Sequence, residues 1–182
     1  MLDRVISQAS AWRRRGHPLL VSLALAAEDL NDPDLAVRVQ LILFKWLVPP
    51  PMLELRLPPD LAAASDGNAR AQLRRLVGAG VRLAADHRLG DPIAPLLRLR
   101  IGAVRLALGR TQGRDLSREV LEDALLTLRD ELGWTLVAIG AAPRRRDLAA
   151  LCDEELAAPI DLAAFEAWLG SAIAPGMKKA AA

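Results

Sequence analysis

The sequence predicts a mainly α-helical protein, a compact bundle of about seven to nine helices, and three observations favour this fold class. Hydrophobic residues make up 52% of the 182-residue chain, whereas aromatic residues make up 3% and tyrosine is absent. A core of leucine, alanine, valine and isoleucine suits closely packed helices better than a barrel or a sandwich. Apolar residues also recur at helical spacing, and the pairs Asp32-Pro33 and Asp91-Pro92 are typical of helix starts.

The first third of the chain is expected to contain three helices. Residues 2–14 carry apolar side chains at helical spacing, and a second helix is expected over 18–29. The third helix, over 33–48, begins at the first Asp-Pro pair and must end at the three consecutive prolines that follow it. Because apolar and polar residues also alternate within this segment, helix and strand both remain open for 36–44.

The middle of the chain predicts one extended segment followed by helices. Apolar residues alternate strictly with polar ones over 52–57, which is typical of an edge strand. A short helix is expected over 59–64 and a long one over 69–88. Gly78 and Gly80 lie inside the long helix, and they indicate either a break in it or a close crossing with another helix.

Two further helices are expected over 92–108 and 115–132. The first follows the second Asp-Pro pair, although the alternation after residue 96 leaves helix and strand open for 97–108. The second carries the clearest apolar stripe in the chain and ends at a glycine.

The apolar run 134–141 fits either a buried strand or the start of a buried helix, and the last two helices are expected over 147–156 and 161–173. An α+β protein with a small sheet is therefore the alternative fold. The organisation expected is one helical domain over 1–175 and a flexible tail over 176–182.

Charge is unevenly distributed along the chain. Residues 68–118 hold 11 arginines against 3 aspartates, whereas residues 119–182 hold more acidic than basic side chains. The simplest interpretation is that basic and acidic helices face each other within the fold. A basic surface that binds nucleic acid is the alternative that region 68–118 leaves open.

Residues that carry catalytic or metal-binding chemistry are scarce. His17 and His87 are the only histidines, and the single cysteine, Cys152, is followed by three acidic residues that disfavour a reactive thiolate. These residues lack the spacing of a metal site. No catalytic residue, metal or cofactor is therefore expected. A lone cysteine, the absence of a signal peptide and the absence of a membrane-spanning segment indicate a cytoplasmic protein.

Arginines provide the only candidate contacts for a partner or an anion, because a guanidinium binds phosphate or carboxylate through two hydrogen bonds. Two basic triplets and one loop with two glycines supply them. The candidates are Arg13, Arg14, Arg15, Arg110, Arg114, Arg144, Arg145 and Arg146.

The sequence therefore predicts a non-enzymatic interaction protein, an accessory, adaptor or assembly subunit of a larger bacterial complex. Its expected partner is another protein, either a second copy of this chain or a different one. The alternative is a nucleic-acid-binding or regulatory protein that uses the basic region 68–118.

Overall fold

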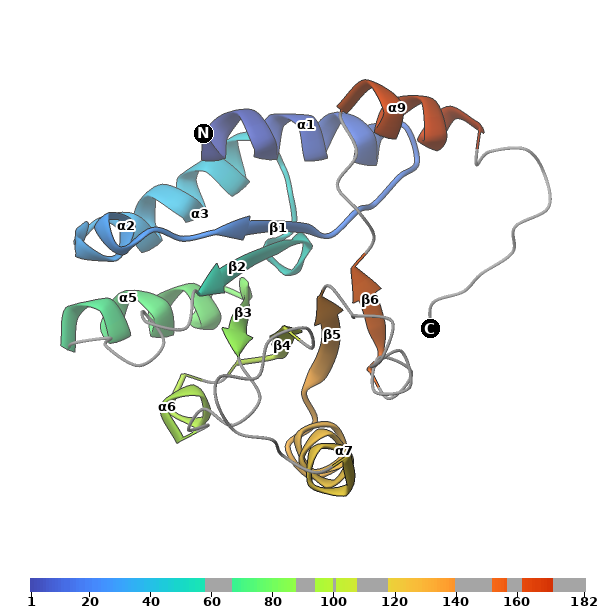
Figure 1. The fold of residues 1–182 in the computed structure, drawn as a ribbon. Helices are drawn as coiled ribbons and strands as arrows, with labels where there is room; N and C mark the ends of the chain where they lie inside the picture. Colours follow the sequence, from blue (N-terminus) through green and yellow to red (C-terminus); the bar gives the residue numbers. More distant parts are fainter. Residues whose placement is uncertain are drawn as a thin grey trace.

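The computed structural model describes residues 1–57, 67–87, 94–99, 101–107, 118–139, 152–156 and 162–171. Within these ranges the chain forms six parallel strands that alternate with helices (Figure 1). The strands lie in one sheet in the order in which they occur in the sequence. They are β1 (Val21–Ala24), β2 (Leu53–Leu57), β3 (Arg82–His87), β4 (Ala103–Ala107), β5 (Thr135–Ile139) and β6 (Glu154–Leu156).

Helices connect the strands. In chain order they are α1 (Leu2–Arg14), α2 (Ala27–Asn31), α3 (Leu35–Lys45), the 3₁₀ turn η1 (Pro50–Met52), α5 (Gly67–Gly78), α6 (Ala94–Leu97), α7 (Arg118–Leu126), the π-helical turn η2 (Thr127–Glu131) and α9 (Leu162–Ser171). The predicted mainly α-helical bundle is therefore wrong, and the protein belongs to the α/β class.

The strand order places the helices on one side of the sheet. Every neighbouring pair is parallel and the order never reverses, so right-handed crossovers bring each connecting helix to the same face. In Figure 1 the helices accordingly lie around the outside of a curved sheet. We call the helix-covered face the outer face and the opposite one the inner face. Such an arrangement is typical of the wall of a β/α barrel.

Leucines on the outer face build the core. Leu53, Leu55 and Leu57 are fully buried on β2, and Leu55 lies in register with Leu83 of β3. Buried side chains of α3 and α5, among them Val39 and Leu73, belong to the same apolar cluster. Because side chains alternate across a strand, the residues between these leucines face inward.

The predicted helices 18–29 and 69–88 are wrong because they contain strands, and the segment 92–108 contains a strand within 97–108, where helix and strand were both open. The segment 18–29 forms β1 and the start of α2, and 92–108 forms α6 and β4. The segment 69–88 forms α5 and then β3, with Gly80 at a φ of 89° in the turn between them. Parallel strands are covered on both faces, so they lack the alternation that identifies an exposed strand.

The carboxyl-terminal helix over 147–156 is also wrong, because β6 occupies residues 154–156; residues 147–151 lie outside the described part of the chain. The segments 59–64 and 176–182 lie outside it as well. Residues 36–44, for which two structures were open, are helical in α3.

Two helices and two strands lie in segments for which the sequence predicted a helix or allowed a strand. Helix α1 occupies residues 2–14, and α9 lies within 161–173. The aromatic rings of Trp12 and Phe165 join these two helices, with their centroids 5.3 Å apart. Strands β2 and β5 fall within the two segments for which extended structure was considered, 52–57 and 134–141.

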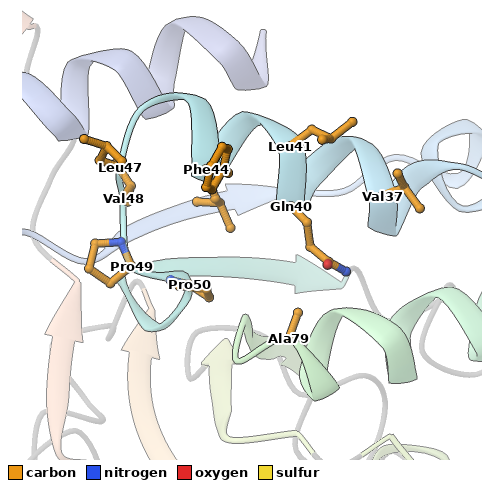
Figure 2. A pocket seen from close by; sticks show the side chains of 10 residues that line it. Val37, Gln40, Leu41, Phe44, Leu47, Val48, Pro49, Pro50 and Ala79 are labelled. Carbon is orange, nitrogen blue, oxygen red and sulfur yellow. The ribbon is translucent and has the colours of Figure 1, made fainter.

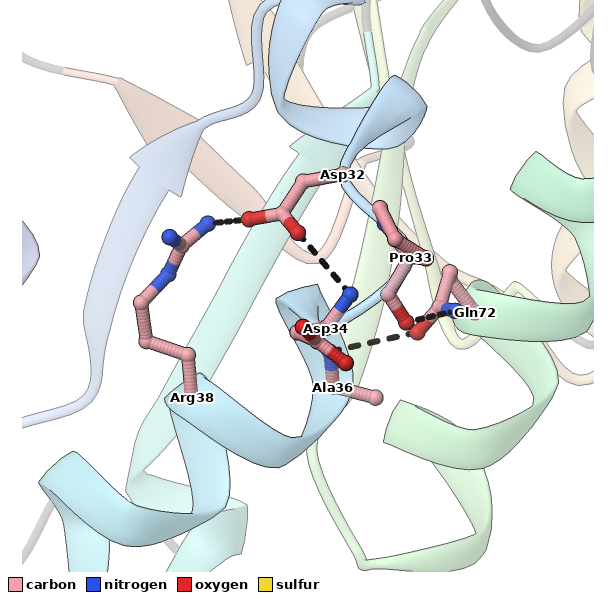
Figure 3. Close-up of polar contacts among 6 residues, drawn as sticks. All are labelled: Asp32, Pro33, Asp34, Ala36, Arg38 and Gln72. Atoms are coloured by element: carbon pink, nitrogen blue, oxygen red, sulfur yellow. Dashed lines mark hydrogen bonds and ion pairs between the residues drawn. The ribbon is translucent and has the colours of Figure 1, made fainter.

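Polar contacts fix the start of α3 (Figure 3). Asp32 accepts a hydrogen bond of 2.8 Å from the backbone amide of Asp34 and forms an ion pair with Arg38. The buried side chain of Gln72, from α5, accepts from the amide of Ala36 at 3.3 Å and donates to the carbonyl of Pro33. The Asp-Pro pair that predicted a helix start therefore lies at one.

Leu47, just beyond α3, has a φ of 54°, which is strained for any residue except glycine. Its side chain is exposed, so packing does not offset the strain. Replacing Leu47 with glycine is expected to raise the free energy of unfolding by about 1 kcal/mol, as measured by urea denaturation. The same change at exposed Leu41, inside α3, should lower it by about 1 kcal/mol. If both variants changed the free energy of unfolding in the same direction, the backbone strain assigned to Leu47 would be wrong.

Candidate functional site

Charged side chains gather on the inner face of the sheet. Glu54 and Arg56 come from β2, Asp86 from β3 and Arg105 from β4. Asp86 and Arg105 are register partners, and Glu54 and Arg56 are the residues between the core leucines of β2. All four therefore face away from the helices. We call them the inner-face cluster.

Asp86 lies between two guanidinium groups. Its Oδ2 is 3.4 Å from Nε of Arg56, and its Oδ1 is 3.5 Å from Nε of Arg105. The side chain of Arg105 is only 10% exposed, whereas that of Asp86 is 32% exposed. Neither Asp86 Oδ1 nor Arg105 Nε has a hydrogen-bond partner, although both atoms are buried. The two atoms face each other as an ion pair, but they do not form a hydrogen bond with each other.

Burial disfavours the charged forms of Asp86 and Arg105 in this cluster. Desolvation raises the pKa of Asp86 above its ordinary value, although Arg56 and Arg105 act in the opposite direction. Desolvation also lowers the pKa of Arg105, with a further contribution from Arg56, while Asp86 and Glu54 oppose the change. For both groups the cost of leaving water exceeds the attraction between them. Ionisable groups perturbed in this way concentrate at functional sites.

The raised pKa of Asp86 predicts the sign of a pH effect. Ionisation of Asp86 is harder in the folded chain than in the unfolded one, so folding loses stability as pH rises through the raised pKa. Relative to the wild type, the Asp86→Asn variant should therefore gain stability from pH 4 towards neutrality. Urea unfolding of both proteins at a series of pH values measures this difference.

Asp130 provides the matched control. A hydrogen bond from Arg129 lowers the pKa of this exposed carboxylate, so its ionised form favours folding. Relative to the wild type, the Asp130→Asn variant should lose stability as pH rises through the lowered pKa. If the Asp86→Asn variant followed the same direction, attraction to the two arginines would outweigh desolvation.

The arginines predicted as partner contacts lie elsewhere. Arg13 and Arg14 occupy the last turn of α1, where their guanidinium groups donate to the Leu47 carbonyl and the Ser10 hydroxyl, each at 2.9 Å. Arg15 caps the same helix. None of the three belongs to the inner-face cluster. The candidates Arg110, Arg114, Arg144, Arg145 and Arg146 lie outside the described residues.

Sequence reasoning missed the inner-face cluster. Asp86 was assigned to the last turn of a helix and Arg105 to another helix, so nothing placed them together. Glu54 and Arg56 carried the usable signal, because they are the charged residues that alternate with leucines in the extended segment 52–57. In a strand covered by helices on its other face, such a residue points to the inner face.

The remaining reactive residues do not form a site in the described part of the chain. His87 is buried on the outer face, in register with Leu106, and Cys152 is half-buried and is not part of a disulfide. Within the described ranges no group of three or more His, Cys, Asp or Glu side chains could hold a metal ion. None of the described helices is long and apolar enough to cross a membrane.

A comparison with models of protein families finds no match. Among curated proteins, a segment of 86 residues, 47% of this chain, is 24% identical to the signaling protein YkoW of Bacillus subtilis (strain 168). The matched segment spans only 11% of the length of that protein.

Solved structures are similar over most of the chain. The EAL domain of Mycobacterium smegmatis DcpA gives a TM-score of 0.76 at 19% identity, covering 93% of this chain and 82% of that one. The EAL enzyme Bd1971, in its cAMP- and cyclic-di-GMP-bound form, gives 0.75 at 12% identity, covering 92% and 50%. The PaMucR phosphodiesterase in complex with c-di-GMP gives 0.67 at 19% identity, covering 82% and 67%.

These likenesses overturn the function predicted from the sequence. A non-enzymatic accessory, adaptor or assembly subunit was expected, with a nucleic-acid-binding or regulatory protein as its alternative, and no enzyme was expected. Two of the three similar structures are instead described as an enzyme and a phosphodiesterase. The chain therefore has the TIM-barrel-like α/β fold of solved EAL domains.

Proposed function

We propose that this chain is a signalling domain that recognises the cyclic dinucleotide c-di-GMP at the inner face of its sheet. The inner-face cluster carries the proposal, because Arg56 and Asp86 lie next to the last residues of β2 and β3, and Arg105 of β4 is the register partner of Asp86. Ligand sites of β/α barrels lie at that end of the sheet. Similar folds are described in complexes with c-di-GMP, and the curated relative is described as a signaling protein.

The chemistry of the cluster suits this ligand. A cyclic dinucleotide presents two anionic phosphodiesters and two bases. Arginine binds phosphate oxygens, or O6 and N7 of guanine, through paired hydrogen bonds. Arg56 and Arg105 provide two guanidinium groups, and Asp86 provides an acceptor for the N–H groups of guanine. The side chains of Arg56 and Asp86 are partly exposed, so a ligand of mixed donors and acceptors can reach them from the inner face.

The proposal concerns binding, and it assigns no catalytic step to the described residues. It covers recognition of the nucleotide and the signalling role that follows from recognition. We place the protein in the cytoplasm, because its single cysteine fits a reducing compartment.

Isothermal titration calorimetry with c-di-GMP tests the proposal. Replacing Arg105 with methionine should weaken binding by at least about 10-fold, since charge-assisted hydrogen bonds contribute roughly 1.5–3 kcal/mol each. Arg75, exposed on α5 at the outer face, is the matched control, and Arg75→Met should leave affinity nearly unchanged. Chromatography of the same samples measures any linear dinucleotide formed from c-di-GMP, so that turnover of the ligand is separated from binding. Lack of binding by the wild-type chain, or equal binding by the Arg105→Met variant, would refute the proposal.

A further inference from the structure

Helix α3 is apolar on two opposite sides. One side, which includes Ala36, Val39 and Leu43, is buried in the core. The other side exposes Val37, Leu41 and Phe44, and Phe44 is 77% exposed (Figure 2). A helix that is apolar on both sides is normally covered on both. The outward side of α3 therefore has the composition of an interface.

Leu47 extends this exposed side beyond the end of the helix. Its backbone has the left-handed conformation that favours glycine, and its side chain is 70% exposed. Within the chain, a leucine here adds strain and an exposed apolar surface without a compensating contact in the core. A leucine at this position is favourable if its side chain packs against another molecule. We call Val37, Leu41, Phe44 and Leu47 the α3 ridge.

A hollow of about 700 Å³ adjoins the α3 ridge. Its walls come from the ridge itself, from the turn at Pro49 and Pro50, and from Ala79 beyond α5 (Figure 2). Ridge and hollow thus belong to one surface of the same chain. A two-fold axis brings such a surface against its own copy, so that each ridge faces the hollow of the other chain.

The charges at the two ends of α3 favour a second copy in antiparallel orientation. Asp34 is exposed at the amino-terminal end of α3. At the other end, Arg13 donates to the Leu47 carbonyl at 2.9 Å, and its buried Nε has no hydrogen-bond partner. A two-fold axis beside Leu41 places Asp34 of each copy opposite Leu47 of the other, next to Arg13. The dipoles of the two antiparallel helices also attract each other.

We propose that the α3 ridge forms an isologous dimer interface between two copies of this chain. Phe44 of each copy packs against Val37 of the other and enters the adjacent hollow. Asp34 of each copy pairs with Arg13 of the other and closes the two ends of the contact. This surface lies on the outer side of the helices, so it is separate from the inner-face cluster.

Analytical ultracentrifugation of the full chain from about 1 to about 100 µM tests this interface. We expect the wild type to dimerise as its concentration rises. Phe44→Glu should weaken dimerisation by at least about 10-fold, because it places a charge in the centre of the apolar contact. Val120→Glu on α7, which changes a residue that is 52% exposed, is the matched control and should dimerise like the wild type. A monomer at every concentration would overturn the proposal, as would a dimer that Phe44→Glu leaves unchanged.

Two further sets of variants test the geometry. Asp34→Arg and Arg13→Asp should each weaken dimerisation, whereas both changes in one chain should restore it. Leu47→Gly should also weaken it, although that variant is expected to be more stable, so misfolding would not explain its loss. Circular dichroism confirms that each variant is folded. If the combined charge exchange fails to restore the dimer in folded protein, the antiparallel interface is wrong.

Discussion

Replacing Asp86 with leucine and Arg105 with methionine together is expected to abolish c-di-GMP binding without lowering the stability of the fold. The free energy of unfolding should stay the same or rise by up to about 3 kcal/mol, because replacing a buried ion pair with apolar side chains removes its desolvation cost. Burial shifts the pKa values of both residues towards their neutral forms, so attraction within the pair does not offset that cost. Urea unfolding and calorimetry measure the two effects on the same protein.

The single variants should behave differently from the double one. Asp86→Leu alone removes the desolvation cost of the carboxylate but leaves Arg105 buried beside Arg56 without that carboxylate between them, so its free energy of unfolding should be lower than that of the double variant. The exposed pair Arg129–Asp130 is the matched control: Arg129→Met with Asp130→Leu should leave the free energy of unfolding nearly unchanged. A double variant at Asp86 and Arg105 that is less stable than either single variant would show that the cluster serves the fold.

Local signals in the sequence predicted helices where caps and periodicity agree. Helix α1 has both a regular apolar spacing and arginines in its last turn. Helix α3 begins just after an Asp-Pro pair and ends before three prolines, and these signals outweighed the alternation inside it. Such features act over a few residues, so one segment is enough to reveal them.

Strand β3 was missed, and β4 was left open between helix and strand, because the composition of both resembles that of helices. Strand β3 is Arg-Leu-Ala-Ala-Asp-His and β4 is Ala-Val-Arg-Leu-Ala, so both are rich in residues with high helix propensity. Their structure depends on pairing with neighbouring strands and on cover from the helices, which are properties of the whole fold. The glycines at 78 and 80 were the local warning, since the helix ends there and β3 follows.

The inner-face cluster depends even more strongly on long-range structure. Arg56, Asp86 and Arg105 lie in three different strands, and only the parallel register brings them together. Knowledge of the strand order and register would have placed Arg56, Asp86 and Arg105 side by side on one face of the sheet. Without that order, a charged residue within an apolar segment is most simply interpreted as solvent-exposed, which is how these residues were missed.

Replacing Leu55 with alanine is expected to lower the free energy of unfolding by about 3–4 kcal/mol, the largest effect predicted for a single core residue. Leu55 is 1% exposed, and it lies in register with Leu23 of β1 and Leu83 of β3 beneath the helices of the outer face. The six-stranded sheet holds it from both sides, so the surroundings cannot collapse into the space that the leucine leaves. Urea unfolding gives the difference directly.

Leu97, which is 47% exposed on α6, is the matched control, and Leu97→Ala should change stability by about 0.5 kcal/mol or less. The comparison also tests the architecture. In a bundle of helices, Leu55 would lie in a crossing segment at the edge of the core, and its truncation would cost little. A loss below about 1 kcal/mol for Leu55→Ala would therefore contradict the parallel sheet as well as the packing on it, because a leucine at the centre of that sheet has no route to solvent.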